Sequence, residues 1–227
     1  MPTPMLPQRL REATWPWHAR AERSGAMALL LRRRLSHGGY VRLLRSLLAL
    51  YEAIEPALSH EAAALQALGA PARSLRRGAA LREDLQRLDP EALRQAPADA
   101  ALRYAARVDT LRGDAAHRLL AHVYVRYLGD LHGGQVLGAL VREAFALHDG
   151  RGTRFYDFGD DDRVRQLRGE QRSLLAAARL SPAQADEVVD EAVWAFEAHV
   201  ELFEQLAAAE SAQEAADLLV QRRGAAG

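Results

Sequence analysis

The sequence predicts an all-α protein that forms a single domain. It is rich in Ala, Leu, Arg and Glu, which are strong helix formers. Apolar residues recur at helical spacing, and the alternating pattern of a half-buried strand is nearly absent. A length of 227 residues with 49% hydrophobic residues is enough for one sizeable core. We therefore expect one domain over residues 1–227, with a packed part at about 10–206 and short flexible ends.

The apolar periodicity and the turn signals place the expected elements along the chain. Helices are expected at residues 7–23, 27–35, 39–68, 72–88, 98–112, 115–147, 160–179 and 182–208. Ser36 is a candidate N-cap for the third helix, and Ser181 followed by Pro182 is a favourable start for the last. The segment 148–159 contains three glycines and no helical period, which indicates a surface connection.

Composition excludes several classes of function. A formal net charge of +0 gives no general argument for binding nucleic acid or an anionic membrane. The absence of cysteine excludes disulfides, thiolate ligands and cysteine nucleophiles. No apolar run approaches the roughly 20 residues of a membrane span, and the first residues lack the core of a signal peptide, so we expect a cytoplasmic protein. All basic side chains except histidine are arginine, which suits bidentate binding of carboxylates.

The predicted helix over 115–147 contains an unusual concentration of glycine. Its middle holds four within ten residues: Gly129, Gly133, Gly134 and Gly138. Each costs about 1 kcal/mol relative to alanine inside a helix, and glycines four apart share a face. Small residues could allow close helix packing, or the backbone could approach a flat, bulky ligand with no side chain between them. Asp130 and His132, which lie among the glycines, favour the ligand interpretation.

His18 is a candidate metal ligand in the first helix. Glu22 follows one turn later, and its carboxylate can accept from Nδ1, which leaves Nε2 free for a metal. A partly exposed histidine with an acidic neighbour is the alternative interpretation, and Pro16 indicates a kink or a late helix start. The sequence shows no dense cluster of histidines and carboxylates, so a zinc or di-iron centre is poorly supported. A porphyrin needs only one axial histidine from the protein.

Four segments of the chain resemble the haem oxygenase family. The central segment, residues 122–135, reads HVYVRYLGDLHGGQ and is similar to the long central motif of that family. Residues 10–22 resemble its proximal-histidine segment, and the similarity continues through 75–85 and 191–206. The resemblance implies an all-α fold that holds haem between a proximal helix and a kinked distal helix.

The resemblance also implies roles for individual residues. His18 matches the proximal iron ligand, Glu22 its hydrogen-bond partner, and Asp130 the carboxylate that organises the distal water network. Other distal positions match at Gly129, Gly133, Gly134, Tyr51, Arg126 and Tyr127. Haem-contacting positions match at Arg11, Tyr124, Arg168, Arg172, Phe196 and Phe203. For the two arginines of the 160–179 helix a solvated basic face is the alternative, and for the two phenylalanines it is ordinary core.

Two histidines depart from the family pattern. His132 replaces a small polar residue of the animal enzymes, and we expect it at the surface or behind the site. His199 replaces an amide side chain near the distal water network, and we expect it to be a distal hydrogen-bonding group.

The implied activity is oxidative cleavage of haem at a meso carbon with O2 and electrons, which yields biliverdin, CO and iron. Haem is then both substrate and cofactor, and a ferredoxin or flavoprotein reductase is the implied electron donor. A non-enzymatic haem carrier or sensor on the same fold is the first alternative, and a helical scaffold without haem is the second. Asp130 argues against a carrier, because a carrier needs no proton relay.

Overall fold

The structure is a computed structural model that describes residues 5–62, 65, 75–147 and 149–224. Within these ranges every regular element is helical, which confirms the all-α prediction. The α-helices are α1 (Leu6–Glu22), α2 (Gly25–Leu31), α3 (His37–His60), α5 (Gly78–Leu88), α6 (Asp99–Asp109), α7 (Leu119–His122), α8 (Gly129–Ala144), α9 (Asp161–Ala177) and α10 (Pro182–Gly224). None of them is both long enough and apolar enough to cross a bilayer.

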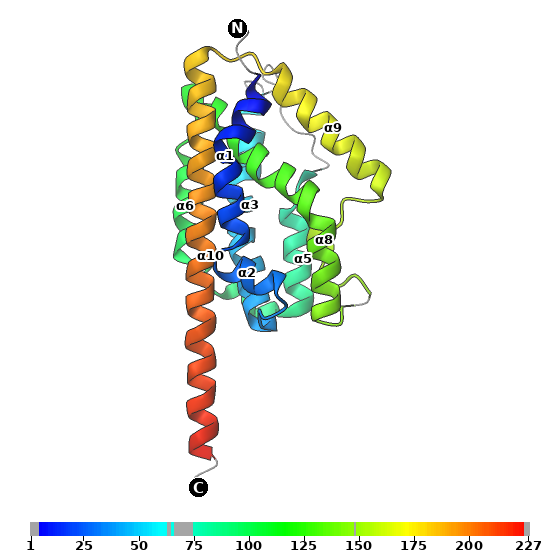
Figure 1. The fold of residues 1–227 in the computed structure, drawn as a ribbon, viewed down its shortest axis with the longest axis vertical. Coiled ribbons are helices and arrows are strands. Elements are labelled where there is room, and N and C mark those ends of the chain that lie inside the picture. The colour runs from blue at the N-terminus through cyan, green and yellow to red at the C-terminus, as the bar shows by residue number, and fades with distance from the viewer. Residues whose placement is uncertain (1–4, 63–64, 66–74, 148, 225–227) are drawn as a thin grey trace.

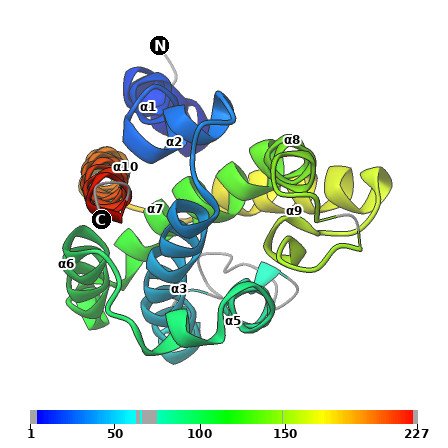
Figure 2. The same cartoon turned by 90° about the horizontal axis from the view of Figure 1, so that it is seen from below.

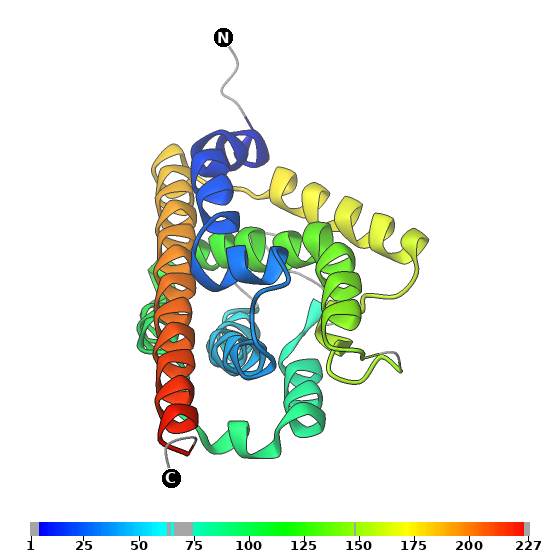
Figure 3. The same cartoon turned by 60° about the horizontal axis from the view of Figure 1, so that its bottom comes forward.

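Helix α3 passes through the middle of the fold and carries the largest share of the core. It packs against α6 on one side and α5 on the other, and α10 packs against α1, α2 and α6 (Figures 1 and 2). Buried apolar side chains recur along α3 from Tyr40 to Ala57. Figure 3 shows α8 and α9 side by side, away from α10 and α6. This arrangement leaves α1 and α10 facing the N-terminal part of α8.

The two predicted N-caps are present, and the structure adds a third. Ser36 Oγ accepts from Gly39 N at 2.9 Å, and Ser181 Oγ accepts from Gln184 N at 3.2 Å. Asp160 caps α9 through Arg163 N at 2.8 Å. Each oxygen satisfies a backbone N–H that has no partner inside its own helix.

The prediction of one continuous helix over 115–147 is wrong. A 3-10 turn at Gly113–Arg118 precedes α7, and a π-helical segment at Val123–Leu128 separates α7 from α8. Five of the six π residues are buried, whereas a regular α-helix buries only a stripe. The wider π turn lets apolar side chains on more than one side of the helix reach the core.

Two further helix boundaries differ from the prediction. The structure ends α3 at His60, and most of the remaining predicted span to residue 68 lies outside the described residues. The helix predicted at 72–88 begins only at Gly78, and residues 72–74 also lie outside the described part. Glu55 explains this start, because its Oε1 accepts from Arg77 N at 2.6 Å and Gly78 N at 2.9 Å. A carboxylate from another helix therefore caps α5.

The last helix is much longer than expected. We predicted an end near residue 208 followed by a short flexible tail, but α10 continues to Gly224. Residues 207–223 are rich in Ala, Glu, Gln and Leu and contain neither Gly nor Pro, so local propensity favours helix throughout. The side chains of residues 211–221 are exposed, and this part of α10 projects beyond the other helices (Figure 1).

The expected surface connection at 148–159 is partly buried. Phe155 and Tyr156 lie in the core within a short 3-10 turn. The buried carboxylate of Asp84 in α5 accepts from Phe155 N at 2.8 Å and from Arg154 N at 2.9 Å. Tyr40 OH donates to the carbonyl of Gly152 at 2.8 Å. These bonds satisfy buried backbone groups and fasten the segment to α5 and α3.

Candidate functional site

A cavity of about 300 Å³ lies between α1, α8 and α10. Its wall is mainly apolar, with side chains from α3 and from the 155–156 turn completing it. Ten of the sixteen predicted site residues line the wall. Seven of them lie in three helices and the π segment and carry side chains: His18, Glu22, Arg126, Asp130, Phe196, His199 and Phe203. The other three are the glycines Gly129, Gly133 and Gly134. The sequence prediction therefore selected residues that are far apart in the chain and adjacent in the fold.

The four glycines of α8 divide into two functional kinds. A Cβ added at Gly129 would meet nothing within 4 Å, and at Gly133 only Leu137 at 3.9 Å. A Cβ at Gly138 would lie 2.9 Å from Tyr156 Cβ, and at Gly134 it would approach Phe158 at 3.7 Å. Gly129 and Gly133 thus expose bare backbone to the cavity. Gly138, by contrast, permits close packing, so both interpretations of the glycine cluster apply to different residues.

His18 lies on the opposite wall, near the end of α1. Its side chain is 46% exposed, and Nδ1 is 3.7 Å from Glu22 Oε1, which is longer than a hydrogen bond. The imidazole is bounded by Trp15, parallel to it at a centroid distance of 6.1 Å, and by Phe196, edge-on at 5.8 Å. The expected hydrogen bond to Glu22 is therefore not formed here, although the two side chains are close enough to make it with a small rotation.

Asp130 is held by a network of buried side chains beside the glycines. Tyr51 OH donates to its Oδ2, and Arg126 donates to its Oδ1 at 2.8 Å. Burial raises the pKa of Asp130 above its usual value, while the charge of Arg126 and the hydrogen bond from Tyr51 lower it. Asp130 is one α-helical turn from Arg126, so the pair also spans the junction between the π segment and α8.

His199 supports Arg126 from α10. Its Nδ1 lies 2.6 Å from the Ala195 carbonyl, so Nδ1 carries the proton and Nε2 is free to accept from Arg126 NH1 at 3.1 Å. Burial and then the charge of Arg126 lower the pKa of His199 to about 3. His199 is consequently neutral, and both ring nitrogens are engaged within the protein. His199 contacts Arg126, which in turn contacts Asp130, and its expected role as a distal hydrogen-bonding group stays a prediction.

A bare backbone wall, a histidine on the facing wall and an apolar lining fit a flat, aromatic metal complex better than a polar metabolite. The N-terminal part of α8 offers the space that a side chain would otherwise fill. Among the described residues, no group of three or more metal-binding side chains is present.

Comparison with known proteins decides the family. The family model described as "Heme oxygenase" matches residues 5–205. The chain is 34% identical to heme oxygenase 1 of Synechocystis over 88% of this chain and 84% of that protein. The chain belongs to the haem oxygenase family. It is also 34% identical to heme oxygenase 1 of the rat, over 89% of this chain and 72% of that protein.

Solved haem oxygenases have the same fold. Heme oxygenase-1 of Synechocystis, solved in complex with haem, superposes with a TM-score of 0.84 and 31% identity over 96% of this chain and 98% of that one. Heme oxygenase-2 of the same organism, solved with haem and NO, gives 0.85 and 32% over 96% and 93%. Each of these relatives is named as an oxygenase, so they give no support to a carrier or sensor.

The remaining predicted residues of this haem oxygenase lie outside the cavity wall. Tyr51 and Tyr127 are buried behind it, with ring centroids 5.6 Å apart. Tyr124 OH lies 3.2 Å from Thr14 Oγ1 and links the π segment to α1. Arg11 is exposed on α1. The predicted contacts of Tyr124 and Arg11 with the substrate therefore remain predictions.

The two arginines of α9 face α8. Arg168 donates to the Leu131 carbonyl, with Nε at 3.0 Å, and Arg172 NH2 lies 3.1 Å from His132 Nε2. The expected surface position of His132 agrees with its exposure, but His132 also lines the cavity. Neither arginine lines the cavity wall itself.

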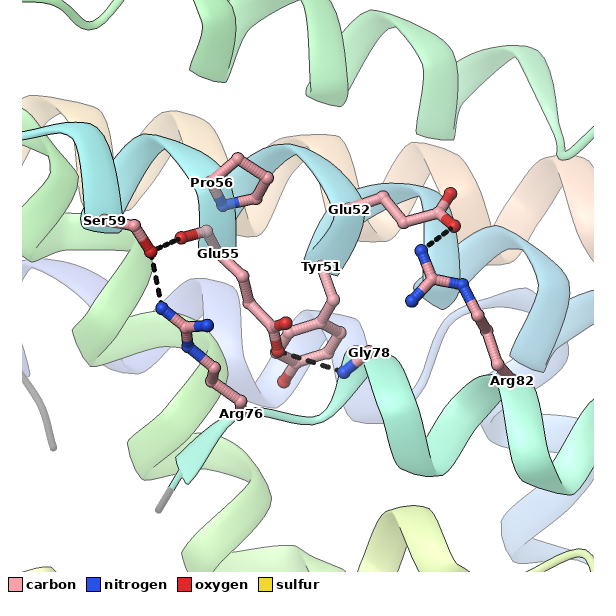
Figure 4. A pocket seen from close by; sticks show the side chains of 8 residues that line it. All are labelled: Tyr51, Glu52, Glu55, Pro56, Ser59, Arg76, Gly78 and Arg82. Carbon is pink, nitrogen blue, oxygen red and sulfur yellow. Dashed lines mark hydrogen bonds and ion pairs between the residues drawn. The ribbon is translucent and has the colours of Figure 1, made fainter. Parts of the chain in front are cut away.

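Sequence reasoning missed the wall contributed by Phe155 and Tyr156. Both belong to the segment 148–159, which its glycines led us to predict as a surface loop. The sequence there has no apolar periodicity that would indicate burial. It also missed a second pocket behind Tyr51, of about 230 Å³, which Figure 4 shows between α3 and α5. Glu55 and Gly78 meet there, and Arg82 pairs with Glu52 at 2.7 Å. Tyr51 thus separates this polar pocket from Asp130.

Proposed function

We propose that this chain is a haem oxygenase that cleaves haem at a meso carbon, with O2 and electrons, into biliverdin, CO and iron. The observation that carries the proposal is the bare backbone at Gly129 and Gly133, which faces His18 across the cavity beside the buried Asp130. Bound haem supplies the redox chemistry and the carbon atom that is attacked. The protein supplies attachment, orientation and a proton donor.

His18 is the proposed axial ligand of the haem iron. Its exposure toward the cavity leaves the imidazole accessible, and Glu22 is within reach of Nδ1. A hydrogen bond from Nδ1 to that carboxylate would fix the tautomer in which Nε2 carries the lone pair. Phe196 and Phe203 complete an apolar surface beside it for the porphyrin ring.

Asp130 is the proposed organiser of proton delivery. It projects into the cavity from the turn that carries Gly129, and Arg126 and Tyr51 fix both of its oxygens. Its raised pKa means that it takes up a proton more readily than an exposed aspartate. Water held by Asp130 at the bare backbone would then be the immediate proton source, while Tyr127 supports Tyr51 from behind.

The haem propionates are the proposed partners of Arg168, Arg172, Arg11 and Tyr124. Arginine binds carboxylates with paired hydrogen bonds, and these side chains belong to the elements around the cavity. The proposed electron donor is a ferredoxin or flavoprotein reductase, and we place the reaction in the cytoplasm, where such donors are available.

Ferric haem added to the purified protein, followed by a reductant in air, tests the function. We expect the Soret band of the complex to disappear while a bilin band rises, and chromatography to identify biliverdin. A stable Soret band under the same conditions, with haem bound, would indicate a carrier or sensor instead. No spectral change on adding haem would indicate a helical scaffold.

A further inference from the structure

Two arginines beside the cavity have no carboxylate partner within the described part of the chain. Arg168 and Arg172 lie one turn apart in α9, and each contacts a residue of α8. In the described ranges of the chain, no Asp or Glu oxygen lies within 4 Å of their guanidinium nitrogens. Arg33 and Arg154, in contrast, each pair with a glutamate at 2.7 and 2.8 Å. The charge on this part of α9 is therefore available to an anion.

His132 is the only side-chain hydrogen-bond partner of Arg172 among the described residues. Its Nδ1 lies 2.7 Å from the Leu128 carbonyl one turn earlier in the chain, so Nδ1 carries the proton. Nε2 then carries a lone pair and accepts from Arg172 NH2 at 3.1 Å. Burial lowers the pKa of His132, the hydrogen bond to the Leu128 carbonyl raises it, and the charges of Arg168 and Arg172 lower it again, so that the neutral form is favoured.

Because His132 is neutral, its hydrogen bond with Arg172 differs from an ion pair with a carboxylate. Glu143 in contact with Arg33 neutralises that arginine and uses two of its N–H groups. His132 uses only one N–H of Arg172 and leaves the positive charge uncompensated. A long arginine side chain loses conformational freedom when it binds, at a cost of roughly 0.5 to 1.5 kcal/mol. A contact that orders the side chain beforehand removes part of this cost.

We infer that His132 is a positioning residue that orders Arg172 at the cavity mouth to receive a carboxylate of the substrate. The inference rests on the proposed function, because it takes a haem propionate as that carboxylate. His132 lines the cavity and is itself exposed, so the arginine that it orders lies at the edge where a charged group of the ligand would remain in water. Arg168 lies one turn earlier and adds a second charge there.

Equilibrium titration of ferric haem tests this role. His132→Phe keeps the ring but removes both the acceptor and the donor, and we expect haem to bind about fivefold more weakly. His132→Gln carries an amide oxygen and an amide N–H, and should restore most of the affinity. His60→Phe, at an exposed histidine far from α9 in the chain, is the matched control and should have no effect.

Coupling to Arg172 separates positioning from a general structural effect. In Arg172→Leu, adding His132→Phe should cause no further loss, because there is no guanidinium left to order. The dimethyl ester of haem lacks free carboxylates, so its affinity should be the same for His132→Phe and the unchanged protein. Losses that add in the double variant, or an equal loss with the ester, would overturn the inference, and so would unchanged affinity for haem itself.

The haem affinities of the single and double variants are measured without turnover, so this test is independent of the proposed activity. If haem binds and the cycle behaves as expected but no biliverdin forms, the proposed oxygenase activity fails while the role of His132 stands. If turnover is normal and the losses are additive, the activity stands and the role of His132 fails. Thermal unfolding of each variant, compared with the unchanged protein, identifies any variant whose affinity changes through misfolding. His132→Gln then decides whether the lost hydrogen bonds are the cause.

Discussion

Gly138 packs against Tyr156 so closely that a methyl group on its Cα would lie 2.9 Å from Tyr156 Cβ. Tyr156 belongs to the turn that Asp84 fastens to α5, so it has little freedom to retreat. Gly129, two and a half turns earlier in the same helix, faces open space. The same substitution should therefore have opposite effects on the stability of the protein at these two positions.

Gly138→Ala should destabilise the protein by about 1 to 3 kcal/mol, the usual cost of inserting a group into a packed interface. Gly129→Ala should stabilise the ligand-free protein by about 0.5 to 1 kcal/mol, because alanine favours helix and its methyl group meets nothing. Urea unfolding measures both changes. The methyl of Gly129→Ala would project toward the haem, so its biliverdin formation should fall despite the added stability. Normal turnover in this variant would contradict the placement of haem against Gly129.

His18→Ala should lose the visible spectrum of a histidine-ligated haem. The side chain is half exposed, so the free energy of unfolding without haem should change by no more than about 0.5 kcal/mol. Added imidazole should restore the spectrum by occupying the vacated position. An unchanged Soret band and unchanged axial signal in the variant would place the iron ligand elsewhere.

Asp130→Asn should bind haem but produce biliverdin at least about tenfold more slowly, because the amide cannot take up and return a proton in the same way. Removal of the carboxylate also deprives buried Arg126 of its counter-ion, so unfolding should be measured in parallel. Glu143→Gln removes an exposed carboxylate from the far end of α8 and serves as the control. Wild-type turnover in Asp130→Asn would exclude the proposed proton role.

The stability of the protein should fall with acid partly because of His199. An unfolded histidine binds its proton near pH 6.5, whereas the pKa of His199 in the folded protein is about 3. Between these values the unfolded state holds the extra proton, so this contribution is complete above pH 6.5 and is lost as pH falls toward 3. His199→Asn should lose at least about 2 kcal/mol less than the unchanged protein between pH 7 and pH 4. Urea unfolding at both pH values checks this, and equal losses would show that folding does not lower the pKa of His199.

The sequence predicts the site well where a local pattern carries the information. Four glycines within one predicted helix lower its stability, so the sequence alone indicates that they serve a packing or binding role. Arg126 and Asp130, which the resemblance assigned separately to the distal network, are four residues apart and form an ion pair at 2.8 Å in the structure.

Relationships between distant segments could not be predicted in the same way. Phe155 and Tyr156 look like loop residues, and only Asp84, about 70 residues earlier, shows why their backbone can be buried. His132 and His199 each contact an arginine from another element, and helix packing brings these side chains together. The protonation state of each imidazole therefore depends on the fold. The π-helical segment has no glycine or proline to mark it, because burial on several sides produces it rather than a local breaker.

The π-helical segment at Val123–Leu128 leads directly into α8. A π-helical turn closes through i→i+5 hydrogen bonds, so it takes up about one residue more than an α-helical turn. In a regular α-helix one extra residue would rotate everything downstream by about 100°. The wider turn absorbs that residue locally, so deleting one residue from this segment should restore a regular α-helix with Gly129 and Asp130 still directed toward His18. The segment thus adds a buried residue to the helix without changing the direction of the distal wall.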